Sequence, residues 1–181
     1  HLVFGGQLIN AQRDLLVHIP LNATILWIGG GTGKIFSDLK SRNPQSITYL
    51  EASIQMLKRA QREAEKYNMT SSVVFRHGTE SNLSQTDSFD VIIPAFFLDQ
   101  FPQKEMENLA KKLSEHLRMN GQWLYADFEE RTGVAALLTK PLIWSMYLFF
   151  YLTSGVKNGR LPNVARFFIQ NGYQKRWRRR S

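Results

Sequence analysis

A cluster of glycines follows a short apolar run, and its spacing predicts a ligand-binding turn. The run stops at three alternate glycines, Gly29, Gly31 and Gly33, and a helical pattern follows. This is typical of a buried parallel strand that turns tightly into a helix. Glycine accepts positive φ angles and lets the backbone approach a ligand, toward which the free N–H groups of the next helix point. The stretch therefore predicts a turn that holds part of a nucleotide-like molecule.

The spacing separates three glycine motifs. In a Walker phosphate loop the first glycine and the hydroxyl residue would fall at Ile28 and Ile35, so that motif fails twice. The dinucleotide fingerprint Gly-x-Gly-x-x-Gly fails because its third glycine would fall at Lys34. What remains is Gly-x-Gly-x-Gly. On this stretch alone, a glycine-rich turn without a ligand is the alternative interpretation.

An acidic residue ends the second predicted strand. Ile47–Leu50 is the second predicted strand and is followed by Glu51, 18 residues after Gly33. Ribose hydroxyls lie at the tip of the second strand in this class of fold. A carboxylate accepts hydrogen bonds from both hydroxyls of a diol, so Glu51 is a predicted ribose ligand. Ser53 then caps a predicted helix over 54–67.

The rest of the chain predicts strands alternating with helices, and this rhythm indicates a parallel sheet with helices on both faces. The expected strands are 24–28, 47–50, 73–75, 89–94 and 121–128, with a last one over 173–180. The expected helices are 5–18, 33–41, 54–67, one marked by Met106, Leu109, Leu113 and Leu117, and 161–170.

The composition is that of an ordinary globular protein. The 181 residues suit one domain, and 43% hydrophobic with 21% charged residues argue against disorder. The absence of cysteine excludes disulfides and cysteine-based metal sites, and no metal is predicted. No signal peptide is visible, which favours a cytoplasmic location. The first residue is His1 rather than Met, which is compatible with a missing N-terminal piece.

The formal net charge of +8 is concentrated at the end of the chain, in Lys175–Arg180. Such a basic end binds nucleic acid or acidic lipids in some proteins, but a solvated terminus is the favoured interpretation, so no specific nucleic-acid partner is expected. The apolar, aromatic run 141–153 is too short for a transmembrane segment. It predicts a buried helix over the sheet, with a pocket wall or an interfacial helix as alternatives. The oligomeric state is left open.

Residues 24 to about 130 resemble the core of the class I S-adenosylmethionine (SAM)-dependent methyltransferases of the small-molecule type. The resemblance is carried by Ile25–Gly33, Tyr49–Glu51, His77–Glu80, Phe89–Phe101 and Gly121–Phe128. It implies an α/β, three-layer Rossmann-like sandwich with strand order 3-2-1-4-5-7-6. One domain over 1–181 would hold an N-terminal helix in 1–20, the SAM-binding core in 24–130, and substrate-side helices with a last strand in 131–181.

The resemblance also implies a set of cofactor contacts. The predicted cofactor-binding residues are Gly29, Gly30, Gly31 and Gly33 under the methionine part, Glu51 on the ribose, Ala52, Gly78, Thr79 and Glu80 around the adenine, and Pro94 and Ala95 near the sulfonium. SAM would be the cofactor, S-adenosylhomocysteine the product, and a small molecule the methyl acceptor.

Three features depart from the family pattern. Trp27 stands where the family usually has an acid that helps to hold the methionine amine. Thr79 stands where an Asp often binds the adenine amine, so Glu80 or the backbone would substitute. Only one strand candidate follows Gly172, where the resemblance implies a hairpin of two.

Methyl transfer from a sulfonium requires alignment and exclusion of water, and a general base only where the acceptor must lose a proton. Asp99 is the preferred base over His77 and Asp127, although a surface acid or helix cap is the commoner role for such a residue. An apolar acceptor pocket is predicted from Phe96, Phe97, Phe101, Trp144 and Tyr147, although each such residue taken singly more often belongs to the core. The competing functions are a SAM-binding module without catalysis, a nucleic-acid methyltransferase and, last, a nucleotide-dependent oxidoreductase.

Overall fold

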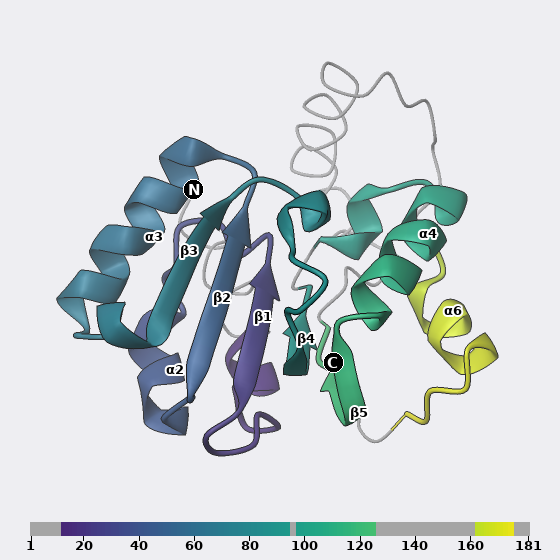
Figure 1. Cartoon of the computed structure of the whole chain (residues 1–181), viewed down its shortest axis with the longest axis horizontal. Helices are drawn as coiled ribbons and strands as arrows, with labels where there is room; N and C mark the ends of the chain where they lie inside the picture. Colours follow the sequence, from purple (N-terminus) through teal and green to yellow (C-terminus); the bar gives the residue numbers. More distant parts are fainter. Residues whose placement is uncertain (1–11, 95–96, 126–161, 176–181) are drawn as a thin grey trace, which may run out of the picture. The chain divides into compact units, whose positions relative to one another are not determined.

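The computed structural model describes residues 12–94, 97–125 and 162–175 (Figure 1). The described residues form two compact units. The first holds 12–94, 97 and 111–125, and the second holds 98–110 and 162–175. Each unit is described by itself, and the expectation of a single domain over 1–181 stays a prediction.

A five-stranded parallel sheet forms the first unit, with the order β3-β2-β1-β4-β5. The strands are β1 (Thr24–Ile28), β2 (Ser46–Glu51), β3 (Val73–His77), β4 (Phe89–Ile93) and β5 (Leu117–Trp123). β1 is central, and Trp27 lies in register with Tyr49 on one side and Ile93 on the other. The first five positions of the predicted order are thereby confirmed, and the fold is the Rossmann-like α/β type.

Four α-helices and four short 3₁₀ helices have described bounds. The α-helices are α2 (Phe36–Leu39), α3 (Ile54–Lys66), α4 (Gln103–Ser114) and α6 (Val164–Gln170). The 3₁₀ helices are η1 (Lys40–Arg42), η2 (Thr70–Ser72), η3 (Glu80–Asn82) and η4 (Leu98–Gln100). Residues 12–16 are also helical. As the sequence predicts, Ser53 caps α3 by accepting a hydrogen bond from the N–H of Met56 at 3.4 Å.

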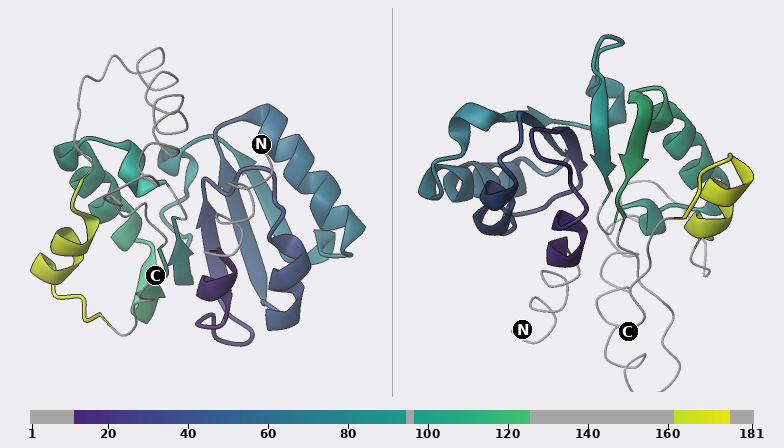
Figure 2. Two further views of the ribbon diagram at one scale, coloured as in Figure 1. Left: turned by 180° about the vertical axis from the view of Figure 1, so that it is seen from behind. Right: turned by 90° about the horizontal axis from the view of Figure 1, so that it is seen from below.

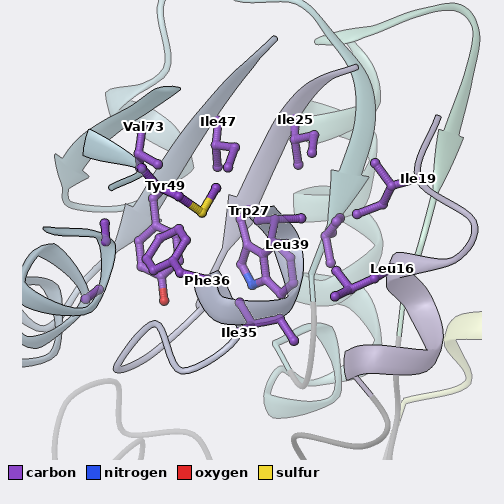
Figure 3. Close-up of a cluster of buried hydrophobic side chains, with 14 of the residues drawn as sticks. Leu16, Ile19, Ile25, Trp27, Ile35, Phe36, Leu39, Ile47, Tyr49 and Val73 are labelled. Carbon is purple, nitrogen blue, oxygen red and sulfur yellow. The ribbon is translucent and has the colours of Figure 1, made fainter. Parts of the chain in front are cut away.

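The core of the first unit lies between the sheet and α2 and α3. These helices lie on the same side of β1, β2 and β3 in both views of Figure 2. Figure 3 shows Trp27, Phe36 and Tyr49 packed together there, all fully buried. The Phe36 and Tyr49 ring centroids are 5.2 Å apart. None of the described helices is long and apolar enough to cross a membrane.

Three predicted boundaries are wrong, and one of them is the start of the helix expected over 161–170, which begins at Val164. The helix expected over 33–41 is α-helical only over Phe36–Leu39 and continues as η1, which ends where Asn43 takes a left-handed φ of 44°. The strand expected from 121 begins at Leu117 instead. Leu117 continues the helical spacing of Leu113 in the sequence, but α4 has already ended at Ser114, and an irregular register opposite Phe89 and Val91 accommodates the extra residues of β5.

The second unit includes the start of α4 and all of α6. The side-chain oxygen of Gln103 accepts a hydrogen bond from the N–H of Asn163 at 2.7 Å, and Asn163 in turn caps α6. The last strand expected over 173–180 is not formed over 173–175, and 176–180 lie outside the described residues. The apolar run 141–153 and most of the helix expected over 5–18 also lie outside them.

Candidate cofactor site at the carboxyl ends of β1 and β2

The glycine turn follows β1 directly. Gly29, Gly31 and Gly33 have φ angles of +69°, +66° and +74°, a region that side-chain-bearing residues rarely adopt. The Gly29 N–H donates to the carbonyl of Leu50 at 3.0 Å, which ties the turn to β2. The Phe36 N–H donates to the carbonyl of Gly33 at 3.0 Å, where the chain enters α2. The expected strand–turn–helix is therefore present.

The glycines of the turn have different surroundings. A Cβ atom on Gly33 would lie 2.8 Å from Cα of Ala60, so close packing against α3 excludes a side chain. A Cβ atom on Gly30 would collide with the ring of Tyr49. A Cβ atom on Gly31 would meet no atom of the described residues within 4 Å. The turn is thus packed against the protein at Gly30 and Gly33, and there is open space at Gly31.

Glu51 ends β2 beside this open space. Its side chain is 8% exposed. Oε2 accepts a hydrogen bond from the N–H of Gly31 at 3.0 Å, and Oε1 accepts one from the N–H of Ser53 at 2.9 Å. No lysine or arginine of the described residues forms an ion pair with Glu51. Each carboxylate oxygen has a further lone pair, so the group is able to accept more hydrogen bonds.

Tyr49 is a part of this site that the sequence does not single out. Its Oη donates to the carbonyl of Gly31 at 3.2 Å. Burial, with the nearby charge of Glu51, raises the pKa of Tyr49 well above its usual value, so the phenol stays a donor. An aromatic residue inside an apolar strand predicts core packing, and the only sequence signal for more was its spacing of two residues from Glu51.

The turn after β3 approaches the same end of β2. The Gly78 N–H donates to the carbonyl of Glu51 at 3.0 Å, and Nε2 of His77 donates to the carbonyl of Ala52 at 3.0 Å. Gly78 has a φ of +140°. The structure therefore brings Glu51, Ala52 and Gly78 together, and His77 has a bridging contact there.

Thr79 and Glu80 begin η3 and have partners of their own. The Thr79 N–H donates to Oδ1 of Asn82 at 2.9 Å, and its hydroxyl shares a 2.8 Å hydrogen bond with that of Ser81. The carboxylate of Glu80 lies 3.7 Å from Nζ of Lys112. These contacts stabilise the turn, and an adenine ring would have to be bound beside them.

Beyond β4, Pro94 is buried and Phe97 packs on the glycine turn. The Cβ position of Gly29 is 2.9 Å from Cδ2 of Phe97. The structure therefore brings Phe97, one of the predicted pocket residues, to the turn. Two other predicted site residues, Ala95 and Phe96, lie outside the described residues.

The remaining predicted site residues belong to the second unit or lie outside the described residues. Asp99 is 5% exposed in η4, and it belongs with Phe101 to the second unit. Trp144, Tyr147 and the alternative base Asp127 lie outside the described residues.

Trp27 lies in the core below the turn. It is fully buried, and its Nε1 has no hydrogen-bond partner among residues 12–94, 97–125 and 162–175. In the position where related sequences carry an acid, this chain therefore has a packing residue.

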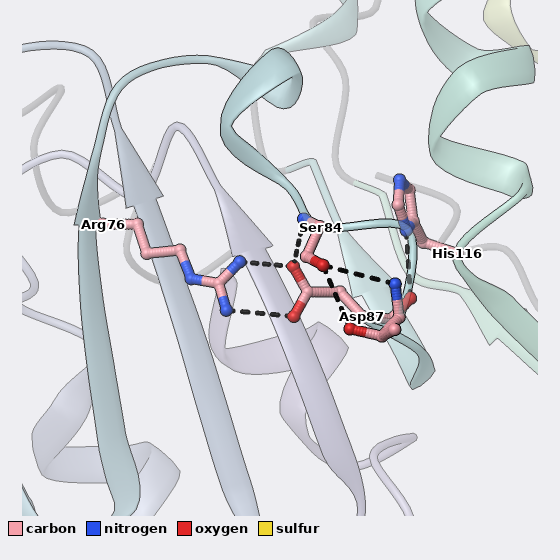
Figure 4. A network of polar contacts seen from close by, with 5 residues as sticks. Arg76, Ser84, Asp87 and His116 are labelled. Atoms are coloured by element: carbon pink, nitrogen blue, oxygen red, sulfur yellow. Dashed lines mark hydrogen bonds and ion pairs between the residues drawn. The ribbon is translucent and has the colours of Figure 1, made fainter.

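A second polar cluster precedes β4 and serves the fold. Figure 4 shows the guanidinium of Arg76 paired with both carboxylate oxygens of Asp87, one of them at 2.9 Å. Asp87 also accepts from the N–H of Ser84 at 2.7 Å, and Nδ1 of His116 donates to its carbonyl at 3.0 Å. The hydrogen bonds from Arg76 lower the pKa of Asp87 below its usual value. Within the described part of the chain, no three His, Asp or Glu side chains form a group that could hold a metal ion.

Comparison with solved structures shows the same fold. A putative O-methyltransferase from Nostoc punctiforme matches 92% of this chain with a TM-score of 0.70 and 16% identity, and 51% of its own length is covered. A SAM-dependent methyltransferase from Thiobacillus denitrificans, in complex with S-adenosylhomocysteine, matches 75% of this chain and 54% of its own, with a TM-score of 0.55 and 18% identity. One from Clostridium acetobutylicum matches 65% and 49%, with a TM-score of 0.53 and 16% identity. The chain thus spans about half the length of these proteins.

A search of curated protein sequences found no match. The profile of the methyltransferase domain family matches residues 25–121, more than half of the chain. The matched range runs from β1 into β5 and includes the glycine turn, Glu51 and the turn after β3. The chain therefore belongs to the methyltransferase domain family, with the fold of its class I SAM-dependent members.

Proposed function

We propose that this protein binds SAM at the carboxyl ends of β1 and β2 and transfers its methyl group to a small, partly apolar acceptor. The observation that carries the proposal is the pairing of Gly31 with Glu51. Gly31 borders open space, and beside it lies a nearly buried carboxylate with no cationic partner among the described residues. A diol with two hydroxyl donors would complete the hydrogen bonding of that carboxylate.

The site residues divide the ligand between them. Gly29, Gly30, Gly31 and Gly33 would hold the methionine part, Glu51 the ribose, Ala52, Gly78, Thr79 and Glu80 the adenine, and Pro94 and Ala95 the region of the sulfonium. The open space at Gly31 and the contact of Gly78 with Glu51 support this division. The capped turn at Thr79 supports recognition of the adenine by backbone groups and shape, rather than by the Asp common in the family.

SAM supplies an already activated methyl group on a sulfonium. The tasks of the protein are therefore to align the acceptor in line with that group and to keep water out. Phe97, packed against Gly29, supports an apolar boundary next to the turn. We further propose Asp99 as the base for an acceptor that must lose a proton, since its side chain is largely shielded from water. Phe96, Phe101, Trp144 and Tyr147 complete the proposed acceptor pocket.

Calorimetry with four ligands tests the binding step. We expect SAM or S-adenosylhomocysteine to bind and NAD and ATP not to bind, because the glycine spacing fits neither alternative motif. Tighter binding of NAD than of S-adenosylhomocysteine would overturn the proposal. Incubation with SAM labelled in its methyl group and a cell extract then tests transfer, with recovery of the label in small molecules as the expected result.

A SAM-binding module without catalysis is the second candidate. It is favoured by Trp27, which packs in the core where the family acid would stand, and it predicts ligand binding without transfer of label. Label recovered in DNA or RNA would instead support a nucleic-acid methyltransferase. Pro94 and the residues after it lack the Asn/Asp-Pro-Pro-Tyr/Phe pattern of enzymes that methylate exocyclic base amines. The cytoplasmic location stays a prediction.

A further inference from the structure

The side chain of Tyr49 contacts the glycine turn on the side that faces the core. It is in register with Trp27 of β1 and is fully buried. Its ring centroid lies 5.2 Å from that of Phe36 and 5.7 Å from that of Phe75. Because aromatic neighbours on two sides fix the ring, its hydroxyl has a defined position under the carbonyl of Gly31, 3.2 Å away.

The same ring determines which residue fits at position 30. A Cβ atom on Gly30 would lie 2.5 Å from Cζ and 2.6 Å from Cε2 of Tyr49. Gly30 is not among the glycines with a positive φ, so its backbone conformation does not itself require glycine. The ring of Tyr49 therefore excludes a side chain at position 30 and packs against the turn.

Gly31 is held from both sides by one strand. Its N–H donates to Oε2 of Glu51 at 3.0 Å, and its carbonyl accepts from Oη of Tyr49. Both side chains come from β2, two residues apart. Since Gly31 is also the glycine with open space beside it, these two contacts set the orientation of the turn where it faces a ligand.

The geometry points to a role for Tyr49 beyond core packing: we infer that it is a positioning residue, which holds the glycine turn in the shape that receives the amino-acid part of the ligand. The inference rests on the proposed function, because it assigns that part of SAM to Gly31. Burial raises the pKa of Tyr49 well above its usual value, so the phenol remains a donor through the neutral range.

Tyr49→Phe tests this role, because it removes the hydroxyl and keeps the ring. The two probes are S-adenosylhomocysteine and 5′-methylthioadenosine, which contains the nucleoside but no amino-acid part; the second is measured by displacement of labelled S-adenosylhomocysteine. Loss of one hydrogen bond that shapes the turn is expected to raise the dissociation constant of S-adenosylhomocysteine about three- to tenfold. The dissociation constant of 5′-methylthioadenosine should stay the same.

If the hydroxyl has a purely structural role, Tyr49→Phe would weaken the binding of both ligands to the same extent or would change neither affinity. Tyr67→Phe is the matched control, since it removes a phenol from a partly buried ring at the end of α3, away from the turn, and should leave both affinities unchanged. Suppose that the wild-type protein binds S-adenosylhomocysteine. If Tyr49→Phe then changes the two dissociation constants equally or not at all, Tyr49 is not a positioning residue for the amino-acid part. If the wild-type protein does not bind S-adenosylhomocysteine, the proposed function fails and the inference fails with it.

Discussion

Glu51 and Asp90 lie at opposite ends of the same sheet and have different partners. Asp90, near the amino end of β4, accepts from the N–H of Thr24 at 2.8 Å and from Nη1 of Arg118 at 3.0 Å. Among the described residues, Glu51 at the carboxyl end of β2 accepts from the backbone N–H groups of Gly31 and Ser53. Asp90 has an arginine partner within the protein, whereas the described hydrogen bonds of Glu51 leave lone pairs on its carboxylate beside the space at Gly31.

This difference indicates that the amino ends of the strands serve stability, whereas the carboxyl ends serve ligand binding. A closed ion pair at the amino ends joins three segments, since Arg118 of β5 also lies 3.3 Å from the hydroxyl of Thr24. At the carboxyl ends, glycines replace side chains and a carboxylate is held in place by backbone donors. A polar group that is nearly buried and not fully bonded is expected where a ligand completes its contacts.

The largest expected effect is a loss of stability on substitution of Gly33, where the glycine turn packs against α3. Gly33→Ala should lower the free energy of unfolding by about 2–4 kcal/mol, because the left-handed φ is costly for alanine and the new Cβ meets Ala60. Urea denaturation measures this. Gly31→Ala is the comparison, with a smaller loss of stability and a larger loss of ligand affinity. Equal stability of the two variants would mean that the turn is not divided in this way.

Glu51→Ala should raise the dissociation constant of S-adenosylhomocysteine roughly ten- to a hundredfold, since hydrogen bonds to a charged acceptor contribute about 1.5–3 kcal/mol. Calorimetry measures it on protein whose fold has been checked by circular dichroism. Asp90→Ala is the matched control, which also replaces an acid by alanine but at the other end of the sheet, and it should leave the affinity unchanged. An unaltered dissociation constant in folded Glu51→Ala would remove Glu51 from the site.

The Arg76–Asp87 pair predicts sensitivity to acid. Because the folded-state pKa of Asp87 is lowered, its contribution is present above the unfolded-state pKa, near 4, and is lost as the pH falls through the folded-state value. Asp87→Asn should cost about 1–2 kcal/mol of unfolding free energy at pH 7 and make the loss of stability in acid shallower. Urea titrations between pH 7 and pH 3 measure how the unfolding free energy of the wild type and of Asp87→Asn depends on pH. The same pH dependence in both proteins would show that the Arg76–Asp87 pair does not cause the acid sensitivity.

The smallest effect is expected at Arg118. Its side chain is 44% exposed and that of Asp90 36%, so solvent screens their ion pair. Arg118→Ala should lower the unfolding free energy by only about 0.2–1 kcal/mol and leave ligand affinity unchanged. Thermal unfolding and calorimetry together check this. A clear loss of S-adenosylhomocysteine binding in this variant would contradict the claim that only the carboxyl ends of the strands bind the ligand.

The parts predicted best from the sequence depend on local patterns. β1 and β2 match within a residue, since the mainly apolar stretches that end at Gly29 and Glu51 are buried on both faces. β5 was misplaced because helical spacing at Leu117 does not reveal that α4 has ended. The contact between Tyr49 and Gly31 could not be predicted, because it joins a side chain to a backbone group 18 residues away and depends on how β1 and β2 pair.

Backbone amide NMR during a titration with S-adenosylhomocysteine tests the central claim most directly. It reports on both ends of the sheet in the same sample. The account predicts that the amide signals of Gly29, Gly31, Glu51 and Gly78 shift with ligand, while those of Thr24, Asp90 and Arg118 do not. Shifts confined to the amino ends of the strands, or no shifts at a saturating ligand concentration, would contradict it.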